Sequence, residues 1–164
     1  MRRIVLGFIF LLVLQSAALA QGSRDRRGWG YLFGGAGGTG GNGSSTGYFS
    51  AGGGAEGLIA GGFGLGGEVG YLGPFESGRD GFGVFSADVG YHFRNASASR
   101  KVVPFLTGGY SLAFRSGTSS GGNYGGGIHY WMKDHVGLRF EFRDHIFSSD
   151  SPHFFQFRVG LSFR

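Results

Sequence analysis

The last thirty residues of the chain alternate between apolar and polar side chains over two long runs. In the first run, 136–143, the even positions carry Val, Leu or Phe and the odd positions carry Gly, Arg or Glu. The second run begins at Phe155 and repeats the pattern to the end of the chain. Strict alternation with a period of two is typical of an extended strand whose two faces meet different surroundings. The pattern predicts two strands, and both a soluble sandwich and the wall of a membrane barrel remain open.

The first twenty residues have the composition of a secretory signal peptide. Arg2 and Arg3 form a basic start, an apolar run follows over 4–14, and the segment ends in Ala-Leu-Ala at residues 18–20. These three features are typical of an exported precursor, and the apolar run is too short to span a bilayer as a helix. We therefore predict a signal peptide over 1–20, cleavage after Ala20 and export of the remainder.

The composition of the exported part limits how it can be stabilised and what it can bind. The sequence has no Cys, 37 Gly, 18 Phe and only 3 Pro, so a small exported domain must here be stabilised without disulfides. Closing a sheet inside a membrane is one such way, because every backbone group is then paired. Without Arg2 and Arg3 the chain has 13 Lys and Arg against 10 Asp and Glu. This excess is small and scattered, so we expect no nucleic-acid partner.

Eight segments of about ten residues follow the polar stretch at 21–28. This is close to the length that a tilted strand needs to cross a bilayer. Their number and near-regular spacing predict an all-β, eight-stranded antiparallel up-and-down transmembrane β-barrel with short loops. In this interpretation 21–28 is a periplasmic lead-in and 29–164 is the barrel domain. The predicted strands are 29–38, 48–56, 63–72, 82–93, 102–114, 124–132, 136–143 and 155–164.

The two faces of these strands differ in charge. One face gathers Phe, Tyr, Leu, Val and Ile, whereas the other carries four acids and three bases among glycines. A charge in a low-dielectric space is costly unless it is paired, so a near-balanced set suits the narrow interior of a small barrel. A secreted Gly/Phe-rich β-sandwich, with these charges on its wet outside, is the alternative. The predicted lumen charge network consists of Glu56, Glu68, Asp88, Arg139, Glu141, Arg143 and Arg158.

Aromatic residues gather near the ends of the predicted strands. Amphipathic rings favour the interface between lipid and water, so two lipid-facing girdles are expected of an outer-membrane barrel. The residues assigned to this aromatic girdle are Trp29, Tyr31, Tyr71, Tyr91, Tyr130 and Trp131.

With its signal peptide, its eight segments and Gly-aromatic strands such as 64–71, the chain resembles the small eight-stranded outer-membrane barrels of bacteria, the OmpA- and OmpX-like barrel domains. The resemblance implies a monomer in contact with outer-membrane lipid, without a cofactor. In that family the last strand carries an aromatic assembly signal, read transiently by the barrel-assembly machinery. Here the chain departs from the pattern, because Phe163 is followed by Arg164. The residues that match the signal are Phe157, Val159, Leu161 and Phe163.

One cluster near the predicted outer rim contains residue types found in hydrolases. Some small barrels modify lipid A, and such chemistry requires a Ser hydroxyl, an imidazole and a carboxylate within hydrogen-bond reach. The same residue types are ordinary in a solvated loop, and the spacing suits no standard metal site. We therefore expect a non-enzymatic barrel with a structural or surface-interaction role and no bound metal, and we keep a lipid-modifying enzyme as the alternative. The cluster contains Asp144, His145, Ser148, Ser149, Asp150 and His153.

Overall fold

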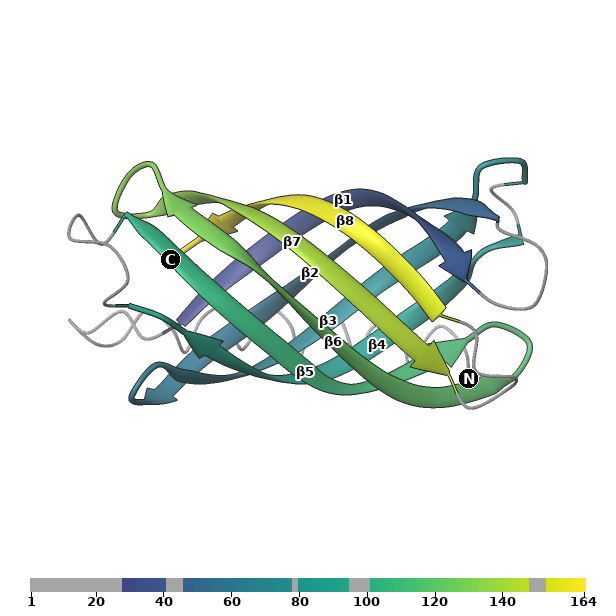
Figure 1. Ribbon diagram of the computed structural model, residues 1–164, viewed down its shortest axis with the longest axis horizontal. Helices are drawn as coiled ribbons and strands as arrows, with labels where there is room; N and C mark the ends of the chain where they lie inside the picture. The colour runs from purple at the N-terminus through teal and green to yellow at the C-terminus, as the bar shows by residue number, and fades with distance from the viewer. Residues whose placement is uncertain (1–27, 41–45, 78–79, 95–100, 148–152) are drawn as a thin grey trace, which may run out of the picture.

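The computed structural model describes residues 28–40, 46–77, 80–94, 101–147 and 153–164. These residues form eight long strands, tilted relative to the axis of a barrel (Figure 1). The predicted signal peptide at 1–20 and most of the predicted lead-in lie outside the described residues. The strands are β1 (Gly28–Gly40), β2 (Gly47–Ala60), β3 (Phe63–Pro74), β4 (Phe82–His92), β5 (Val102–Phe114), β6 (Thr118–Trp131), β7 (Val136–Phe147) and β8 (His153–Phe163).

The strands form one closed, fully antiparallel barrel, which confirms the predicted fold class. Each strand pairs with the next along the chain, and β8 pairs with β1 over eleven residue positions, from Gly30 opposite Phe163 to Gly40 opposite His153. Closure removes the free sheet edge that an open sheet would expose. It also satisfies the strand backbone internally, as a structure in lipid requires.

The barrel has two different ends. One end is called here the terminal end. It contains the start of β1, the end of β8 and the β2–β3, β4–β5 and β6–β7 connections. The β2–β3 connection is a tight turn in which Gly61 and Gly62 have φ values of 59° and 92°, a region that favours glycine. The other four connections lie at the opposite end, the far end (Figure 1).

Strand β6 begins earlier than its sequence pattern predicts. The stretch 115–123 was expected to be a loop, but β6 starts at Thr118 and pairs with β5 from Phe114 opposite Thr118 onward. The Ser and Gly residues at 118–122 lack apolar alternation, and the pairing with β5 and β7 imposes the extended conformation on them. The loop prediction was therefore wrong over these residues.

The outer wall of the barrel is apolar. Large aliphatic and aromatic side chains from all eight strands are exposed there, and a band of this kind is expected where the surrounding solvent is lipid. None of the described residues forms an apolar helix long enough to span a membrane. Exposed residues of the wall include Leu32, Leu65, Val69, Phe85, Val89, Leu106, Ile128, Phe140, Phe157 and Val159.

Candidate functional site

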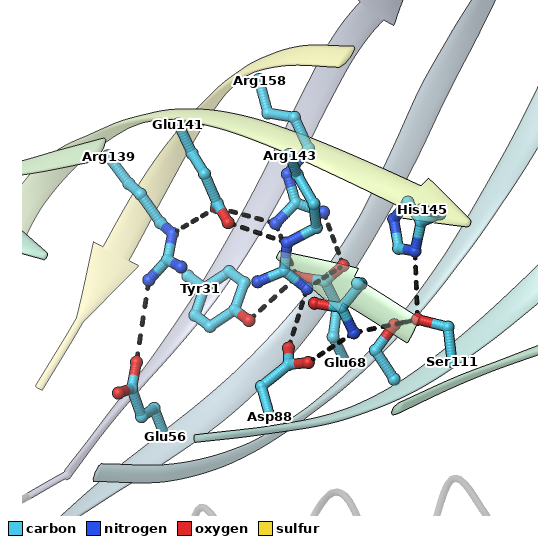
Figure 2. A network of polar contacts seen from close by, with 12 residues as sticks. Tyr31, Glu56, Glu68, Asp88, Ser111, Arg139, Glu141, Arg143, His145 and Arg158 are labelled. Carbon is cyan, nitrogen blue, oxygen red and sulfur yellow. Dashed lines mark hydrogen bonds and ion pairs between the residues drawn. The ribbon is translucent and has the colours of Figure 1, made fainter. Parts of the chain in front are cut away.

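The interior of the barrel contains a connected set of charged side chains (Figure 2). On β7, Arg139, Glu141 and Arg143 occupy alternate positions and are buried, and Phe140 and Phe142 between them are exposed on the outer wall. The strand period of two thus places the charges inside and the rings outside. The structure brings together all seven residues of the predicted lumen charge network, which are Glu56, Glu68, Asp88, Arg139, Glu141, Arg143 and Arg158.

Arg158 on β8 joins two of the carboxylates. Its Nη1 and Nη2 atoms donate to the two carboxylate oxygens of Glu68 at 2.5 and 2.8 Å, and Nη2 also donates to Glu141 Oε2 at 2.7 Å. The Tyr31 hydroxyl donates to Glu68 Oε2 at 2.9 Å. The guanidinium lies 4.0 Å from the centre of the Phe33 ring, a favourable cation–π distance. Forked Arg–carboxylate pairs of this kind are among the strongest hydrogen-bonded contacts in proteins.

Arg139 and Arg143 flank Glu141 on the inner face of β7. Arg143 donates from Nε to Glu141 Oε1 at 2.9 Å and from Nη1 to Asp88 Oδ2 at 2.8 Å. Arg139 donates from Nε to Glu141 Oε2 at 2.8 Å, and its Nη1 lies 2.9 Å from His129 Nε2. Glu141 therefore contacts three guanidinium groups, counting Arg158. Several partners per ion are what a buried charge needs to offset its loss of hydration.

His92 extends the network toward the terminal end. Its Nε2 atom lies 2.6 Å from Glu56 Oε1, and the other oxygen of Glu56 lies 3.8 Å from Arg139 Nη1. Four carboxylates thus face three guanidinium groups and one imidazole. Sequence reasoning did not include His92 in the network. Its position four residues after Asp88 on the same strand face was the available signal.

A layer of smaller polar side chains continues the network toward the far end. Asn123 Nδ2 donates to Asp88 Oδ1 at 2.8 Å and to Ser111 Oγ at 2.9 Å. Ser111 Oγ also lies 3.0 Å from His145 Nδ1 and 2.8 Å from Ser86 Oγ. Ser111 and His145 are fully buried, so this Ser–His pair packs the interior and presents no nucleophile to the surroundings. Sequence reasoning missed Asn123 because it assigned that residue to a loop.

Apolar and aromatic clusters enclose the polar layers on both sides. Toward the terminal end the buried rings of Trp29 and Trp131 lie with centroids 6.2 Å apart, and both contact His129. At the far end, Tyr48, Leu72, Val84 and Phe147 form a second buried cluster. The charged residues therefore lie in the middle of the lumen, between two apolar plugs.

Half of the predicted aromatic girdle lies inside the barrel. Tyr71, Tyr91 and Tyr130 are on the outer wall, Tyr91 partly buried against Phe63 and Phe93, but Trp29, Tyr31 and Trp131 are buried in the lumen. The assignment of these last three residues to a lipid-facing girdle was wrong.

Glycines on the neighbouring strand explain why the β1 rings point inward. A side chain at Gly54 would clash with the Tyr31 ring, and one at Gly52 would clash with Phe33. These two inward-facing glycines of β2 leave the space that the rings occupy. For Trp131 the sequence itself argued against the girdle assignment. Trp131 directly follows Tyr130, and adjacent strand residues face opposite sides of a sheet.

The structure places the remaining predicted site residues in different parts of the barrel or does not describe them. Phe157, Val159, Leu161 and Phe163 lie exposed on the outer wall of β8. Of the hydrolase-like cluster, Ser148, Ser149 and Asp150 lie outside the described residues.

Asp144, His145 and His153 do not form one site. His145 points into the lumen, whereas Asp144 contacts His153 at 2.8 Å and lies on the outer wall between inward-facing Arg143 and His145. Within the described parts of the chain, no group of three or more His, Cys, Asp or Glu side chains could hold a metal ion.

The arrangement of an apolar outer wall around a charged interior agrees with the comparison with known families. Residues 6–163 match the family described as the outer membrane protein beta-barrel domain. The chain belongs to this family. Membership confirms the resemblance to small outer-membrane barrels and places the protein in the bacterial outer membrane. No curated protein matches the sequence.

Solved structures support the same fold at low sequence identity. Neisserial surface protein A is 17% identical with a TM-score of 0.68, covering 83% of this chain and 96% of that one. The N-terminal β-barrel domain of Pseudomonas aeruginosa OprF is 14% identical with a TM-score of 0.56, covering 82% and 97%. Ail, the attachment invasion locus protein of Yersinia pestis, is 12% identical with a TM-score of 0.51, covering 83% and 95%. At these identities the likeness shows the fold alone.

Proposed function

We propose that the protein is a non-enzymatic outer-membrane barrel whose lumen is closed by its own side chains and whose role is structural or exerted through its outer surface. The observation that supports this proposal is the position of the charge network in the lumen, with a buried apolar cluster on each side of it. An eight-stranded barrel is only wide enough for its side chains, and aqueous channels need about sixteen strands.

The proposal includes an orientation in the membrane. With an even number of strands both chain ends lie on one side, which we assign to the periplasm after removal of a signal peptide over 1–20. Two of the three terminal-end connections are short turns, at Gly61–Gly62 and at 132–135, as expected for periplasmic turns. The outward-facing side chains of β8 then form the signal for the barrel-assembly machinery. We further propose a monomer without a cofactor.

The far end is then the cell-exterior rim, and one polar tether links two of its connections. Arg115 Nη2 donates to Asp80 Oδ1 at 2.9 Å, and the Ser77 hydroxyl donates to Asp80 Oδ2 at 2.5 Å. The Ser77 hydrogen bond, and then Arg115, hold the pKa of Asp80 below its ordinary value. This tether joins the β3–β4 and β5–β6 connections. A partner that binds the rim would therefore meet two connections that are held together.

Conductance measurements test the closed lumen. The purified protein, shown to be folded by a heat-dependent shift in gel mobility, is added to planar lipid bilayers. We expect no steady single-channel conductance under conditions in which a sixteen-stranded porin conducts. Steady conductance of the wild-type protein would overturn the proposal of a filled lumen. Release of fatty acid from outer-membrane lipid by the purified protein would overturn the non-enzymatic assignment.

A further inference from the structure

Asp144 lies on the outer wall of the barrel, where charged residues are rare. It pairs in register with Tyr124 on β6 and Phe155 on β8, and both of these side chains are on the outside. Residues that are paired across strands point to the same face of a sheet. The other carboxylates of the described strands, Glu56, Glu68, Asp88 and Glu141, all belong to the lumen network. An ionisable side chain on the lipid-facing wall is a candidate functional residue by default.

Asp144 is held by two neighbours on the same wall. Its Oδ2 atom accepts a hydrogen bond from the Tyr124 hydroxyl at 3.0 Å and lies 2.8 Å from His153 Nδ1. The contact uses Nδ1 of His153, so Nε2 of the same ring is left for another partner. The Asp144 side chain is only 7% exposed, whereas that of His153 is 47% exposed. The carboxylate is thus enclosed, and the imidazole reaches the surroundings.

One acceptor atom of this cluster has no partner. Both hydrogen bonds of Asp144 go to Oδ2, and Oδ1 is buried without any hydrogen bond. Leaving a buried acceptor unsatisfied is costly, and more so when it is charged. Oδ1 therefore has the capacity to accept a hydrogen bond from a donor group. Its neighbours Tyr124 and His153 are both about half exposed.

The position of the cluster identifies where that donor comes from. His153 is the first residue of β8, and Asp144 lies three residues before the end of β7, both at the far end of the barrel. At about 3.4 Å per residue, less the strand tilt, Asp144 lies within about 10 Å of that rim. With the orientation proposed above, this depth is the headgroup region of the outer leaflet. Below the cluster, the exposed rings of Phe142 and Phe157 continue the apolar wall.

The surroundings of Asp144 favour a sugar over an anion. A carboxylate repels a phosphate, whereas it accepts hydrogen bonds from hydroxyl and amide groups. Tyr110 and Tyr124 are exposed on adjacent strands, with outward glycines at 108 and 122 opposite them. Glycine has no side chain that could cover the ring opposite it. The two exposed rings therefore offer flat apolar faces against which a sugar ring can lie.

We propose that Tyr124, Asp144 and His153 bind the sugar headgroup of an outer-leaflet glycolipid, which donates a hydroxyl or amide N–H to Asp144 Oδ1 while its acyl chains lie along the apolar wall. The site rests on the proposed orientation. It deepens the surface role proposed above by naming a lipid partner, and it requires no chemical step.

Native mass spectrometry of the intact protein in detergent tests this site. The probes are a phosphorylated acylated glucosamine disaccharide, the same lipid without phosphates, and phosphatidylethanolamine. We expect the wild-type protein to retain one molecule of either glycolipid in preference to the phospholipid. Asp144→Asn is expected to weaken glycolipid binding at least about tenfold, and His153→Gln and Tyr124→Phe are expected to weaken it less.

Tyr91→Phe is the matched control, because Tyr91 lies on the outer wall near the terminal end of β4. It should leave glycolipid binding unchanged. Loss of binding with the phosphate-free lipid, equal retention of the phospholipid, or no effect of Asp144→Asn would each overturn the proposal. A heat-dependent gel shift is measured for every variant. A folded, non-conducting barrel without glycolipid binding refutes this site alone, whereas failure of the shift or a steady conductance refutes the proposed function.

Discussion

Acid–base pairs occur in two regions of this barrel, the lumen and the outer wall. The two regions differ in how many of the carboxylate oxygens have a polar partner. In the lumen every carboxylate oxygen of Glu56, Glu68, Asp88 and Glu141 has a polar partner within 4 Å. On the outer wall, Asp144 uses one oxygen twice and leaves the other without a partner. Arg158 Nε and Asn123 Oδ1 in the lumen are also buried without a hydrogen-bond partner. They are enclosed within the barrel, whereas Asp144 lies on the outer wall beside half-exposed side chains that a ligand can contact.

Removal of Arg158 should have the largest effect on stability. Arg158→Leu leaves Glu68 and Glu141 buried with fewer partners, and breaking a buried ion pair costs about 3–5 kcal/mol. Urea unfolding of the protein folded into lipid vesicles measures the loss. Arg115→Leu is the control, because the side chains of Arg115 and Asp80 are 53% and 61% exposed, and its effect should be far smaller. Equal losses in the two variants would argue against an enclosed network.

A charge placed at Val69 on the outer wall should be costly, because the cross-strand neighbours of this residue are Gly53 and Phe85, which cannot pair with a charge. Val69 lies near the middle of β3 and is exposed. Val69→Arg is expected to lower the free energy of unfolding by about 2–4 kcal/mol, as for cations near the middle of a bilayer. The same urea titration in vesicles measures it. An unchanged midpoint would mean that this face of the barrel meets water.

Tyr31→Phe tests the position of a residue that the sequence pattern misplaced. The substitution removes the hydroxyl that donates to Glu68, and a hydrogen bond to a charged group contributes about 1.5–3 kcal/mol. Tyr130→Phe on the outer wall is the matched control and should leave stability nearly unchanged. If both variants unfolded at the same urea concentration, the assignment of Tyr31 to the lumen would fail.

Asp144→Asn should have the smallest effect on stability. One oxygen of this carboxylate has no hydrogen bond, and its partner His153 is 47% exposed. Asn keeps an amide oxygen that can accept from Tyr124, so the loss should be about 1 kcal/mol or less. Unfolding in vesicles without glycolipid measures this. A loss as large as that of Arg158→Leu would make the outer-wall pair a structural feature and would remove the contrast between the two regions.

The fold could be predicted from the sequence because strand alternation is a local property. Runs such as 136–143 and 155–164 show apolar and polar faces without any knowledge of their neighbours. The start of β6 could not be predicted in this way, because Ser and Gly at 118–122 carry no alternation and are held extended by their pairing with β5 and β7.

The candidate sites depend on which side of the sheet is inside, and this is a property of the closed barrel. Charged residues at alternate positions within the strands indicated the lumen network, but aromatic rings fit either face, so Trp29 and Tyr31 were misplaced. Their inward direction depends on glycines such as Gly54 on the neighbouring strand. Asp144 and His145 were likewise grouped in one cluster, although adjacent positions in a strand belong to opposite faces.

A double-mutant cycle on Arg158 and Glu68 tests the central claim most directly, namely that these charges are paired inside an enclosed lumen. The free energy of unfolding is measured in vesicles for the wild type, Arg158→Leu, Glu68→Leu and the double variant. Because replacing a whole buried pair by apolar residues is often neutral, the double variant should lose much less stability than the two single losses combined. Additive losses would contradict the account and place the two side chains in independent, solvated surroundings.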